Sequence, residues 1–569
     1  MTPRVTITPH DVFTLTPEQQ AFLDDGVRPF TRKLAEIARK NREGSNPNVF
    51  SPEVFWEAFE AFKAHDMLIY GTPEEYGGFP VSDRMQALIT KEICRADAGI
   101  GLSVGATDAL FIRPILAEGT PEQKLRWVPR FTAGDLIACY CQTEPGAGSD
   151  VAAKRVQAKD LGNGRFSISG EFTFITNGSE ANAGLVMVIT NPDAESPGDR
   201  FTIFIVDFDQ AKADGTLSIG RNFEKLGLHN SPTTILSFTE AIVTSEDILG
   251  ELHGGWSVAM NLLTASRAII LAMQAVGIMD EAIDLVDEYV ERREVFGLTL
   301  AQLKNIKREC LVMRTRTGMI EALGLYSSAF KDAVTAADIS DSRAYELEAS
   351  AAKLLAGEWV RDVVRQAFQI FGGTGYMMES RIAHLIGDSL IVGVYEGTTQ
   401  VQSMLVIKGL LGIILENMGA MAKVKVAAGG SILDDKLIAK LLEEWPFWKL
   451  AGDGIAEWEQ TGVGSKLLAA RAEFLHLLAT AAADADFGAM SLRSEPRNQA
   501  PIWFRIAEAY SVHLAATLLS LDPQADPEGV SMSAALAEVE IAFSAVTAEL
   551  NLMQDNVYRA YLLEEPSKS

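Results

Sequence analysis

The chain has little cysteine and much less positive than negative charge. Four cysteines in 569 residues are too few for a disulfide framework, which excludes a disulfide-stabilised scaffold and favours a reducing compartment. We therefore expect a cytoplasmic protein. The 50 Lys and Arg residues against 76 Asp and Glu residues give a net charge of −26, and a field of this sign repels phosphate-rich polymers. We expect no nucleic acid partner.

The sequence also gives no sign of a metal site or a membrane segment. Cys139 and Cys141 lie two residues apart on a predicted strand and so share a face, but no second Cys or His pair with ligand spacing accompanies them. The opening segment MTPRVTITPH contains no apolar stretch of signal-peptide length. The longest nearly apolar run, Ala268 to Met279, is too short to cross a bilayer. We predict no metal and no integral membrane insertion.

The order of helical and β-rich patterns predicts several domains. At about 150 residues per domain, the length indicates three to four domains. Helical periodicity runs from about Thr16 to Arg130, gives way near Gly134 to short β-rich runs, and resumes at Gly255. The predicted fold class is α+β and multidomain. Its parts are an N-terminal α-helical domain (1–134), a middle β-barrel or β-sandwich domain (135–251), a C-terminal four-helix-bundle domain (252–415) and an additional C-terminal helical domain (416–569).

The individual elements follow from the same patterns. Predicted strands are 136–141, 165–170, 172–176, 184–190, 201–208 and 233–238, with a hairpin turn at Gly162-Asn163-Gly164. Predicted helices after the amphipathic pattern that starts at Gly255 are about 300–332, 342–371, one from about 398, and then 433–444, 466–485, 503–521 and 533–563.

The segment Gln142 to Asp150 is the most informative motif. It runs from a predicted strand into a turn with two glycines and several hydroxyl or carboxylate side chains. Glycines let a ligand approach the backbone closely, so such a turn can present N–H groups to an anion or to the polar edge of a ring. The chemistry of the segment alone favours a plain surface turn over a ligand site.

The string TEPGAGSD (143–150) resembles, residue for residue, the flavin-binding segment of the acyl-CoA dehydrogenase family. Further motifs of that family follow in order: FITNG (174–178), KLG (225–227) with Ser231, REVFG (293–297), QIFGG (369–373) and YEGTTQ (395–400). The resemblance covers about residues 15 to 412. It implies FAD bound between the β domain and the helical bundle, and oxidation of an acyl-CoA thioester to the trans-2-enoyl-CoA.

Glu396 is the candidate catalytic base. An acidic residue near a helix start is commonly a solvated cap, but the match to the family's Y-E-G-T motif implies the base that removes the α-proton, with hydride transfer to flavin N5. The backbone N–H of Glu396 would help a flavin ribityl hydroxyl to polarise the thioester carbonyl. A minority of members place the base just before an arginine on the earlier helix, where this chain has Ser266 before Arg267.

The resemblance assigns further residues by motif position. For FAD it implies Tyr140, Cys141, Gln142, Thr143, Phe174, Ile175 and Thr176 around the isoalloxazine ring, Gly148 and Ser149 near the pyrophosphate, Lys304, and Thr398 with Gln400. For the FAD of a neighbouring subunit in a homodimer it implies Arg293 and the segment Gln369, Ile370, Phe371, Gly372 and Gly373. For the substrate it implies Ser149, Arg267 and Gly397. Without the motif, Arg293 reads as a solvated charge in an exposed charged run.

Several positions depart from the family pattern. Lys304 stands where the family often has Phe or His before Gln, and Gly387-Asp388 stands for its Arg-Asp pair. Arg267 lies one residue farther from Gly277 than in the family, which rotates it by about 100° on a helix, and Thr264 replaces the usual Asp. These differences indicate an unusual substrate or subfamily.

Alternatives remain open at the level of function. The resemblance implies electron-transferring flavoprotein as the electron acceptor, but a flavin oxidase or monooxygenase-like relative has the same fold. Some relatives with an added C-terminal helical domain are nucleic-acid-associated damage-response flavoproteins; the acidic balance of residues 416–569 opposes that reading. Gly99, Gly101 and Gly105 would either leave room for a long or branched acyl chain or allow close helix packing.

Overall fold

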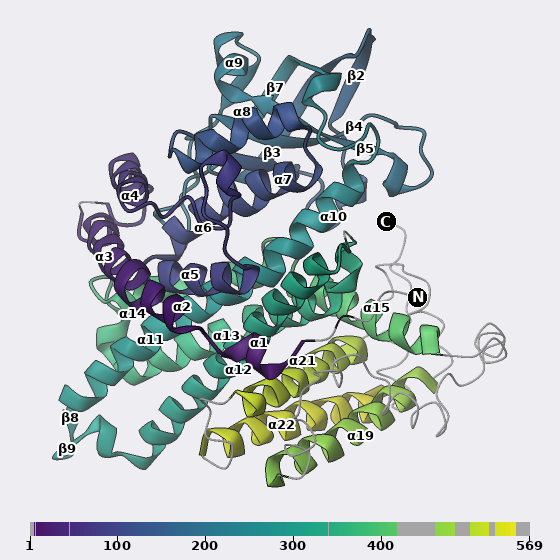
Figure 1. Cartoon of the computed structure of the whole chain (residues 1–569). Helices are drawn as coiled ribbons and strands as arrows, with labels where there is room; N and C mark the ends of the chain where they lie inside the picture. Colours follow the sequence, from purple (N-terminus) through teal and green to yellow (C-terminus); the bar gives the residue numbers. More distant parts are fainter. Residues whose placement is uncertain are drawn as a thin grey trace, which may run out of the picture. The chain divides into compact units, whose positions relative to one another are not determined.

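The computed structural model describes residues 5, 7–44, 46–339, 341–417, 461–483, 501–522 and 530–553. The chain forms two compact units (Figure 1). Unit 1 comprises residues 1–14, 301–359 and 397–569, and unit 2 comprises residues 15–300 and 360–396. Each unit is described by itself below.

Unit 2 begins with helices whose starts are set by capping residues. Thr16 caps the first of them, its hydroxyl accepting a hydrogen bond from the Gln19 backbone N–H with Pro17 in the first turn, as the Thr16-Pro17 pattern predicts. The helices are α2 (Pro17–Ala21), α3 (Arg28–Arg42), α4 (Pro52–Ala64), α5 (Asp83–Ala96), α6 (Ala98–Thr107), α7 (Arg113–Glu118) and α8 (Pro121–Thr132). Two π-helical segments, Phe22–Val27 and Asp108–Ile112, lie between them.

A seven-stranded sheet follows in unit 2. Its strands are β1 (Ala138–Cys141), β2 (Gln157–Gly162), β3 (Arg165–Thr176), β4 (Ala183–Ile189), β5 (Phe201–Asp207), β6 (Leu217–Ile219) and β7 (Thr233–Thr244), with α9 (Phe208–Ala213) after β5. The order is β1-β4-β2-β3-β7-β6, and β5 pairs with β4. Alternate residues of β3 and β7 point inward and build an apolar core that includes Phe172, Leu236 and Phe238. The sheet thus presents the ends of β1 and β3 as a rigid support.

Unit 2 closes with long helices. They are α10 (Gly255–Ser266) and α11 (Ala272–Arg292), joined by the π-helical segment Arg267–Leu271, then the hairpin β8 (Glu294–Val295) and β9 (Leu298–Thr299), the second part of α13 (Glu346–Phe371), and α14 (Arg381–Leu390). Helices α5 and α11 lie side by side because Gly277 of α11 brings the two backbones together (Figure 1).

Unit 1 is helical in its described residues. It contains α1 (Pro9–Phe13), α12 (Lys304–Ala336), the first part of α13, α15 (Thr399–Asn417), α19 (Gly462–Ala483), α21 (Pro501–Leu521) and α22 (Val530–Met553). Helices α12, α19, α21 and α22 pack on one another, and Arg316 of α12 pairs with Glu538 of α22.

The α+β multidomain fold class is confirmed. Segments 165–170 and 172–176, predicted as two strands, are one strand, because Gly170 forms a bulge at φ 150° and β3 continues beyond it. The Gly162-Asn163-Gly164 turn joins β2 to β3 with positive φ at all three residues. Segment 433–444 lies outside the described residues, as do the last residues of the segments predicted at 466–485 and 533–563. The four domain limits stay a prediction.

Three described helical stretches have the length and composition to cross a membrane: Ala98–Glu118, Gly255–Arg292 and Ser531–Leu552. Inside the protein, 61%, 89% and 39% of their apolar windows are buried, respectively. The first two are mostly covered by the protein itself, as core helices are. The absence of membrane insertion stays a prediction.

Candidate active site

The glycine-containing turn after β1 is fixed at both ends and open in the middle. The Thr143 carbonyl accepts a hydrogen bond from the Thr173 backbone N–H of β3 at 2.9 Å. The buried Glu144 carboxylate accepts hydrogen bonds from two further backbone N–H groups, those of Arg155 and Val156, at 2.7 and 3.2 Å. A Cβ placed on Gly146 or Gly148 would meet no atom of the described residues within 4 Å. The backbone of this turn is therefore accessible to a ligand.

Lys154 lies beneath this turn, a position that the sequence analysis did not single out. Its ammonium donates a hydrogen bond to the Gln142 carbonyl, pairs with Glu144 at 3.3 Å and lies 4.9 Å from the centre of the Phe172 ring. Burial lowers the pKa of Lys154 to about 8, although Glu144 opposes the shift. A lysine four residues after the TEPGAGSD motif was the signal available in the sequence.

The end of β3 lies beside this turn and presents an aromatic surface. Phe174 adopts φ 58°, unusual for a bulky residue, and its ring packs against Phe223 with 5.3 Å between centroids, leaving 65% of the residue exposed. Ile175 is buried and Thr176 half-buried. Accessible glycine backbone next to an exposed aromatic face fits a flat ring that carries phosphates, so this part of unit 2 fits FAD.

Glu396 follows a turn that holds its backbone in a left-handed conformation, with φ 52°. The preceding Tyr395 donates its hydroxyl hydrogen to the Gln274 side-chain carbonyl, and Gln274 in turn donates to the Ala98 carbonyl at 3.1 Å. Burial, and then the charges of Cys141 and Glu396, raise the pKa of Tyr140 on β1. The half-buried Glu396 carboxylate thus lies within electrostatic reach of the strand that leads into the glycine-containing turn.

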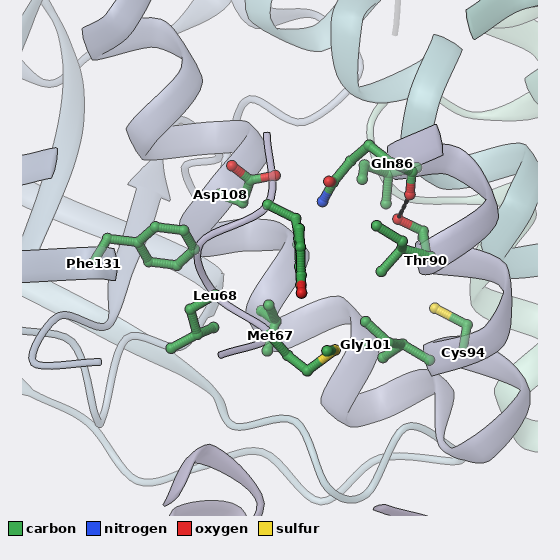
Figure 2. Close-up of a pocket in the computed structure, with 14 residues that line it drawn as sticks. Met67, Leu68, Gln86, Thr90, Cys94, Gly101, Asp108 and Phe131 are labelled. Carbon is green, nitrogen blue, oxygen red and sulfur yellow. Dashed lines mark hydrogen bonds between the residues drawn. The ribbon is translucent and has the colours of Figure 1, made fainter. Parts of the chain in front are cut away.

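A cavity of about 30 Å³ adjoins this region within unit 2 (Figure 2). It is lined mainly by α5 and α6, including Ile93, Cys94, Gly101 and Gly105. Burial, and then the charges of Glu396 and Cys94, raise the pKa of Tyr395, which connects the cavity wall to the candidate base.

The three glycines of α6 serve two purposes, close helix packing and room for a ligand, which the sequence alone could not separate. A Cβ on Gly99 would come within 3.2 Å of the Leu228 backbone, so Gly99 serves close packing. Gly101 and Gly105 line the cavity. At Gly101 a Cβ would lie 2.5 Å from the Cys94 sulfur, so a larger residue there would press on the cavity wall.

A second group of assigned residues comes together at the ends of α11 and α13. The rings of Tyr289 and Phe371 stack with centroids 4.2 Å apart, and the Tyr289 hydroxyl donates to the Phe371 carbonyl at 3.4 Å. Arg293, one turn after Tyr289, is exposed. Gln369, Gly372 and Gly373 are exposed and Ile370 is half-buried. Arg293 and the 369–373 segment thus form one exposed surface, consistent with their assignment to one ligand group.

Four assigned residues belong to unit 1: Lys304, Gly397, Thr398 and Gln400. Lys304 is exposed at the start of α12, and Thr398 caps α15. The Gly397 carbonyl accepts hydrogen bonds from the buried Lys353 at 2.7 Å and from Gln402 at 3.2 Å. Lys353 was missed at the sequence level; a lone lysine in the apolar run ASAAKLLAG was its signal.

The two remaining substrate candidates differ in exposure. Ser149 is exposed on the glycine-containing turn. Arg267 is 3% exposed and donates hydrogen bonds to the Leu263 carbonyl and the Thr264 hydroxyl of its own helix. Their roles, like those of the FAD residues above, stay predictions.

The arginine that is missing at position 387 has a substitute nearby. A Cβ on Gly387 would lie 1.8 Å from the Leu226 carbonyl oxygen, so no side chain fits there. Arg381 instead pairs with Asp388 at 3.1 Å and with both carboxylate oxygens of Glu281, at 2.7 and 2.8 Å. Asp388 also accepts a hydrogen bond from the Leu228 backbone N–H at 2.6 Å. Arg381 thus places a guanidinium beside Asp388, although position 387 carries no arginine.

Within the described part of the chain, no three or more His, Cys, Asp or Glu side chains are arranged to hold a metal ion. Cys139 and Cys141 share a face of β1 as expected, with their sulfurs 3.9 Å apart. None of the four cysteines, all of which lie in the described residues, forms a disulfide, and all four are buried.

Known proteins match the sequence and the fold. The N-terminal, middle and C-terminal domains of acyl-CoA dehydrogenase match residues 16–135, 139–241 and 253–411. The acyl-CoA dehydrogenase of Bacillus subtilis (strain 168) is 30% identical over 69% of this chain and 98% of its own length.

Two solved structures extend the comparison. The butyryl-CoA dehydrogenase of Megasphaera elsdenii is similar with a TM-score of 0.63 and 28% identity, over 70% of this chain and 99% of that one. An acyl-CoA dehydrogenase of Bacillus anthracis in complex with FAD is similar over 99% of this chain and 95% of its own, with a TM-score of 0.74; at 20% identity it shows the fold alone. From the three domain matches and the Bacillus subtilis relative, the chain belongs to the acyl-CoA dehydrogenase family, FAD-dependent oxidoreductases that act on CH–CH bonds.

Proposed function

We propose that this enzyme converts an acyl-CoA thioester to the trans-2-enoyl-CoA, with Glu396 as the base that accepts the α-proton. The observation that carries the proposal is the place of Glu396, half-buried and within electrostatic reach of Tyr140 on the strand that enters the TEPGAGSD turn. A carboxylate partly withdrawn from water is a stronger base than a solvated one. Bound FAD supplies the hydride acceptor.

The residues around Glu396 support that role by fixing its backbone. Tyr395, the residue before it, is anchored through Gln274, which in turn donates a hydrogen bond to the Ala98 carbonyl. A base fixed in this way loses little freedom when the substrate arrives, which is the basis of catalysis by positioning. The open backbone of Gly146 and Gly148, with Ser149, would hold phosphate groups.

The test is anaerobic titration of the FAD-loaded protein with acyl-CoA thioesters, followed by flavin bleaching. Glu396→Gln keeps the shape and removes the base, so we expect it to retain FAD and to bleach at least about 10²-fold more slowly. Glu118→Gln, at an exposed carboxylate at the end of α7, is the matched control and should bleach at the wild-type rate. Normal bleaching by Glu396→Gln would show that another group is the base.

The electron acceptor is the second part of the proposal. In line with the family resemblance, electrons pass to an electron-transferring flavoprotein, as in fatty acid β-oxidation, and the buried free thiols agree with a cytoplasmic location. The rate at which each electron acceptor reoxidises the bleached enzyme distinguishes a dehydrogenase from an oxidase. We expect rapid reoxidation by the flavoprotein and slow reoxidation by oxygen, with little hydrogen peroxide; the reverse order would indicate an oxidase.

We also propose a homodimer in which each subunit completes the FAD site of the other. Its support is the exposed apolar surface near Arg293 and the 369–373 segment. Phe296, at the tip of the β8–β9 hairpin, is 98% exposed, and Tyr376, Met377 and Met378 are exposed as well. Large apolar side chains exposed in this way are typical of protein interfaces.

A further inference from the structure

One end of the cavity in unit 2 is polar, although the rest is apolar. Figure 2 shows the Gln86 amide and the Asp108 carboxylate pointing into its upper part, and Met67, Gly101 and Cys94 around its lower part. The side-chain oxygen of Gln86 is buried and has no hydrogen-bond partner among the described residues. The same holds for the Nη2 atom of Arg113.

Both unpaired atoms lie beside Gly71. A Cβ built on Gly71, next to the cavity-lining Tyr70, would lie 2.8 Å from Arg113 Nη2 and 3.2 Å from Gln86 Oε1. Because Gly71 has no side chain, both polar groups have room beside it. Of the two, Gln86 lines the cavity. A buried acceptor left unpaired costs free energy, so the Gln86 oxygen suits a ligand group that donates a hydrogen bond.

The charges around this end select against a carboxylate. The Arg113 guanidinium is already paired with Asp108 at 3.1 Å and with Asp83 at 2.7 Å, so two carboxylates face one cation. A second anion next to Asp108 would be repelled in a region of low dielectric constant. An uncharged polar group meets no such penalty.

We propose that this pocket selects a short acyl chain whose distal end carries an uncharged hydrogen-bond donor, such as a hydroxyl, held by the side-chain oxygen of Gln86. The inference rests on the proposed acyl-CoA dehydrogenation. The cavity volume of about 30 Å³ is small, of the order needed for one or two small polar groups, which agrees with a short chain.

The test compares three thioesters of equal chain length: pentanoyl-CoA, 5-hydroxypentanoyl-CoA and glutaryl-CoA. Binding is measured by calorimetry on the FAD-loaded Glu396→Gln variant, and kcat/KM on the wild-type enzyme. We expect the hydroxylated thioester to bind roughly 10-fold more tightly than pentanoyl-CoA, with glutaryl-CoA weakest. If pentanoyl-CoA or glutaryl-CoA binds as tightly as the hydroxylated thioester, the inference about the polar end is wrong, but the dehydrogenase proposal is unaffected. If none of the three thioesters bleaches the wild-type flavin, the result contradicts the dehydrogenase proposal instead.

Substitution of Gln86 tests whether the preference for the hydroxylated thioester arises at the polar end of the cavity. Gln86→Leu removes the acceptor and should abolish the roughly 10-fold preference for the hydroxyl, while Ile89→Leu, which changes an apolar wall residue of the same cavity at constant volume, should keep it. FAD content and melting temperature check that both variants fold. A preference that persists in Gln86→Leu contradicts the assignment, and if this variant does not fold, the ranking of the three thioesters on the wild type decides.

Discussion

At the scale of single residues, two buried ionisable side chains away from the proposed base have opposite effects on stability. Glu348 of α13 is 5% exposed, and burial raises its pKa to about 7 from 4.5. Below about pH 4.5 the Glu348 carboxyl is protonated in both the folded and the unfolded protein. Between pH 4.5 and 7 it loses its proton in the unfolded chain but keeps it in the folded protein, so the free energy of unfolding falls as the pH rises through this window. Above about pH 7, the loss of stability caused by burying the ionised carboxylate is constant at roughly 3 kcal/mol.

We therefore expect Glu348→Gln to stabilise the protein at about pH 8 by up to about 3 kcal/mol and to have little effect near pH 4.5. The measurement is urea denaturation as a function of pH. Glu540→Gln, at an exposed residue of α22, should leave the pH profile unchanged. A Glu348→Gln variant that is less stable at pH 8 would mean that the carboxylate has a favourable charged interaction in the folded state.

Arg381 is the opposite case, a buried charge whose partners depend on it. Its side chain is 13% exposed, and those of Glu281 and Asp388 are 17% and 7% exposed. Arg381→Met leaves two buried carboxylates without this cation, which should cost about 3–5 kcal/mol of unfolding free energy. Arg292→Met breaks an exposed pair with Glu288 and should cost less than about 1 kcal/mol. Equal melting temperatures for the two variants would refute this account.

Residues that belong to a contiguous family motif could be proposed for the site from the sequence alone. Residues that bind the backbone of distant segments could not. Glu396 and the TEPGAGSD turn are contiguous strings, so their assignment needed no knowledge of the fold. Lys353 and Lys154 act on the carbonyls of Gly397 and Gln142. Asp83 of α5 pairs with Arg113 of α7 only because the fold brings these two residues together. No local pattern encodes such contacts.

At the scale of elements, the π-helical segment Arg267–Leu271 accounts for the extra residue between Arg267 and Gly277. A π turn takes up one residue more than an α turn, so the helix absorbs the insertion and Gly277 still packs on α5. The spacing between Arg267 and Gly277 indicated one inserted residue. The rotation of Arg267 by about 100° assumed a regular α-helix, which this segment is not. Strands β2 and β6 escaped prediction because β2 has a single buried position and β6 has three residues.

The contact between α5 and α11 depends on Gly277. A Cβ there would lie 2.6 Å from the Lys91 carbonyl oxygen and 2.7 Å from the Arg95 nitrogen, both backbone atoms that cannot move aside. Gly277→Ala should therefore destabilise the protein by about 1–3 kcal/mol. In Gly318→Ala on α12 the nearest atom is a Leu519 methyl carbon at 3.5 Å, and this variant should gain up to about 1 kcal/mol from helix propensity. Chemical denaturation of both separates packing from propensity; equal effects would contradict the packing argument.

At the scale of the whole molecule, the order of motifs predicted the family and the α+β fold class, because each motif lies at the end of an element that the fold requires. The grouping of α12 and part of α13 with the C-terminal helices in one compact unit was not predictable, since it depends on long-range packing such as the Arg316–Glu538 pair. The proposed homodimer is likewise a property of assembly. It implies that Glu396 and Arg293 of one subunit serve different active sites.

Complementation between two defective subunits tests that assembly. Glu396→Gln and Arg293→Ala subunits, each with its own affinity tag, are co-expressed and the mixed dimer is purified through both tags. If Arg293 serves the partner's FAD, one of the two sites in the mixed dimer has both residues intact, and the specific activity should be about half that of the wild type. Each variant homodimer lacks an intact site and should be inactive or poor in FAD.

A mixed dimer of wild-type and Glu396→Gln subunits is the control, and it should also show about half the activity, because it too keeps one complete site. If Arg293 instead bound the FAD of its own subunit, the dimer of the two defective subunits would contain one site without the base and one without the arginine, and its activity would stay as low as that of the homodimers. Recovery of no doubly tagged species would rule out the dimer itself. The exposed Phe296 beside Arg293 offers a second check, since Phe296→Asp should weaken association and FAD retention together.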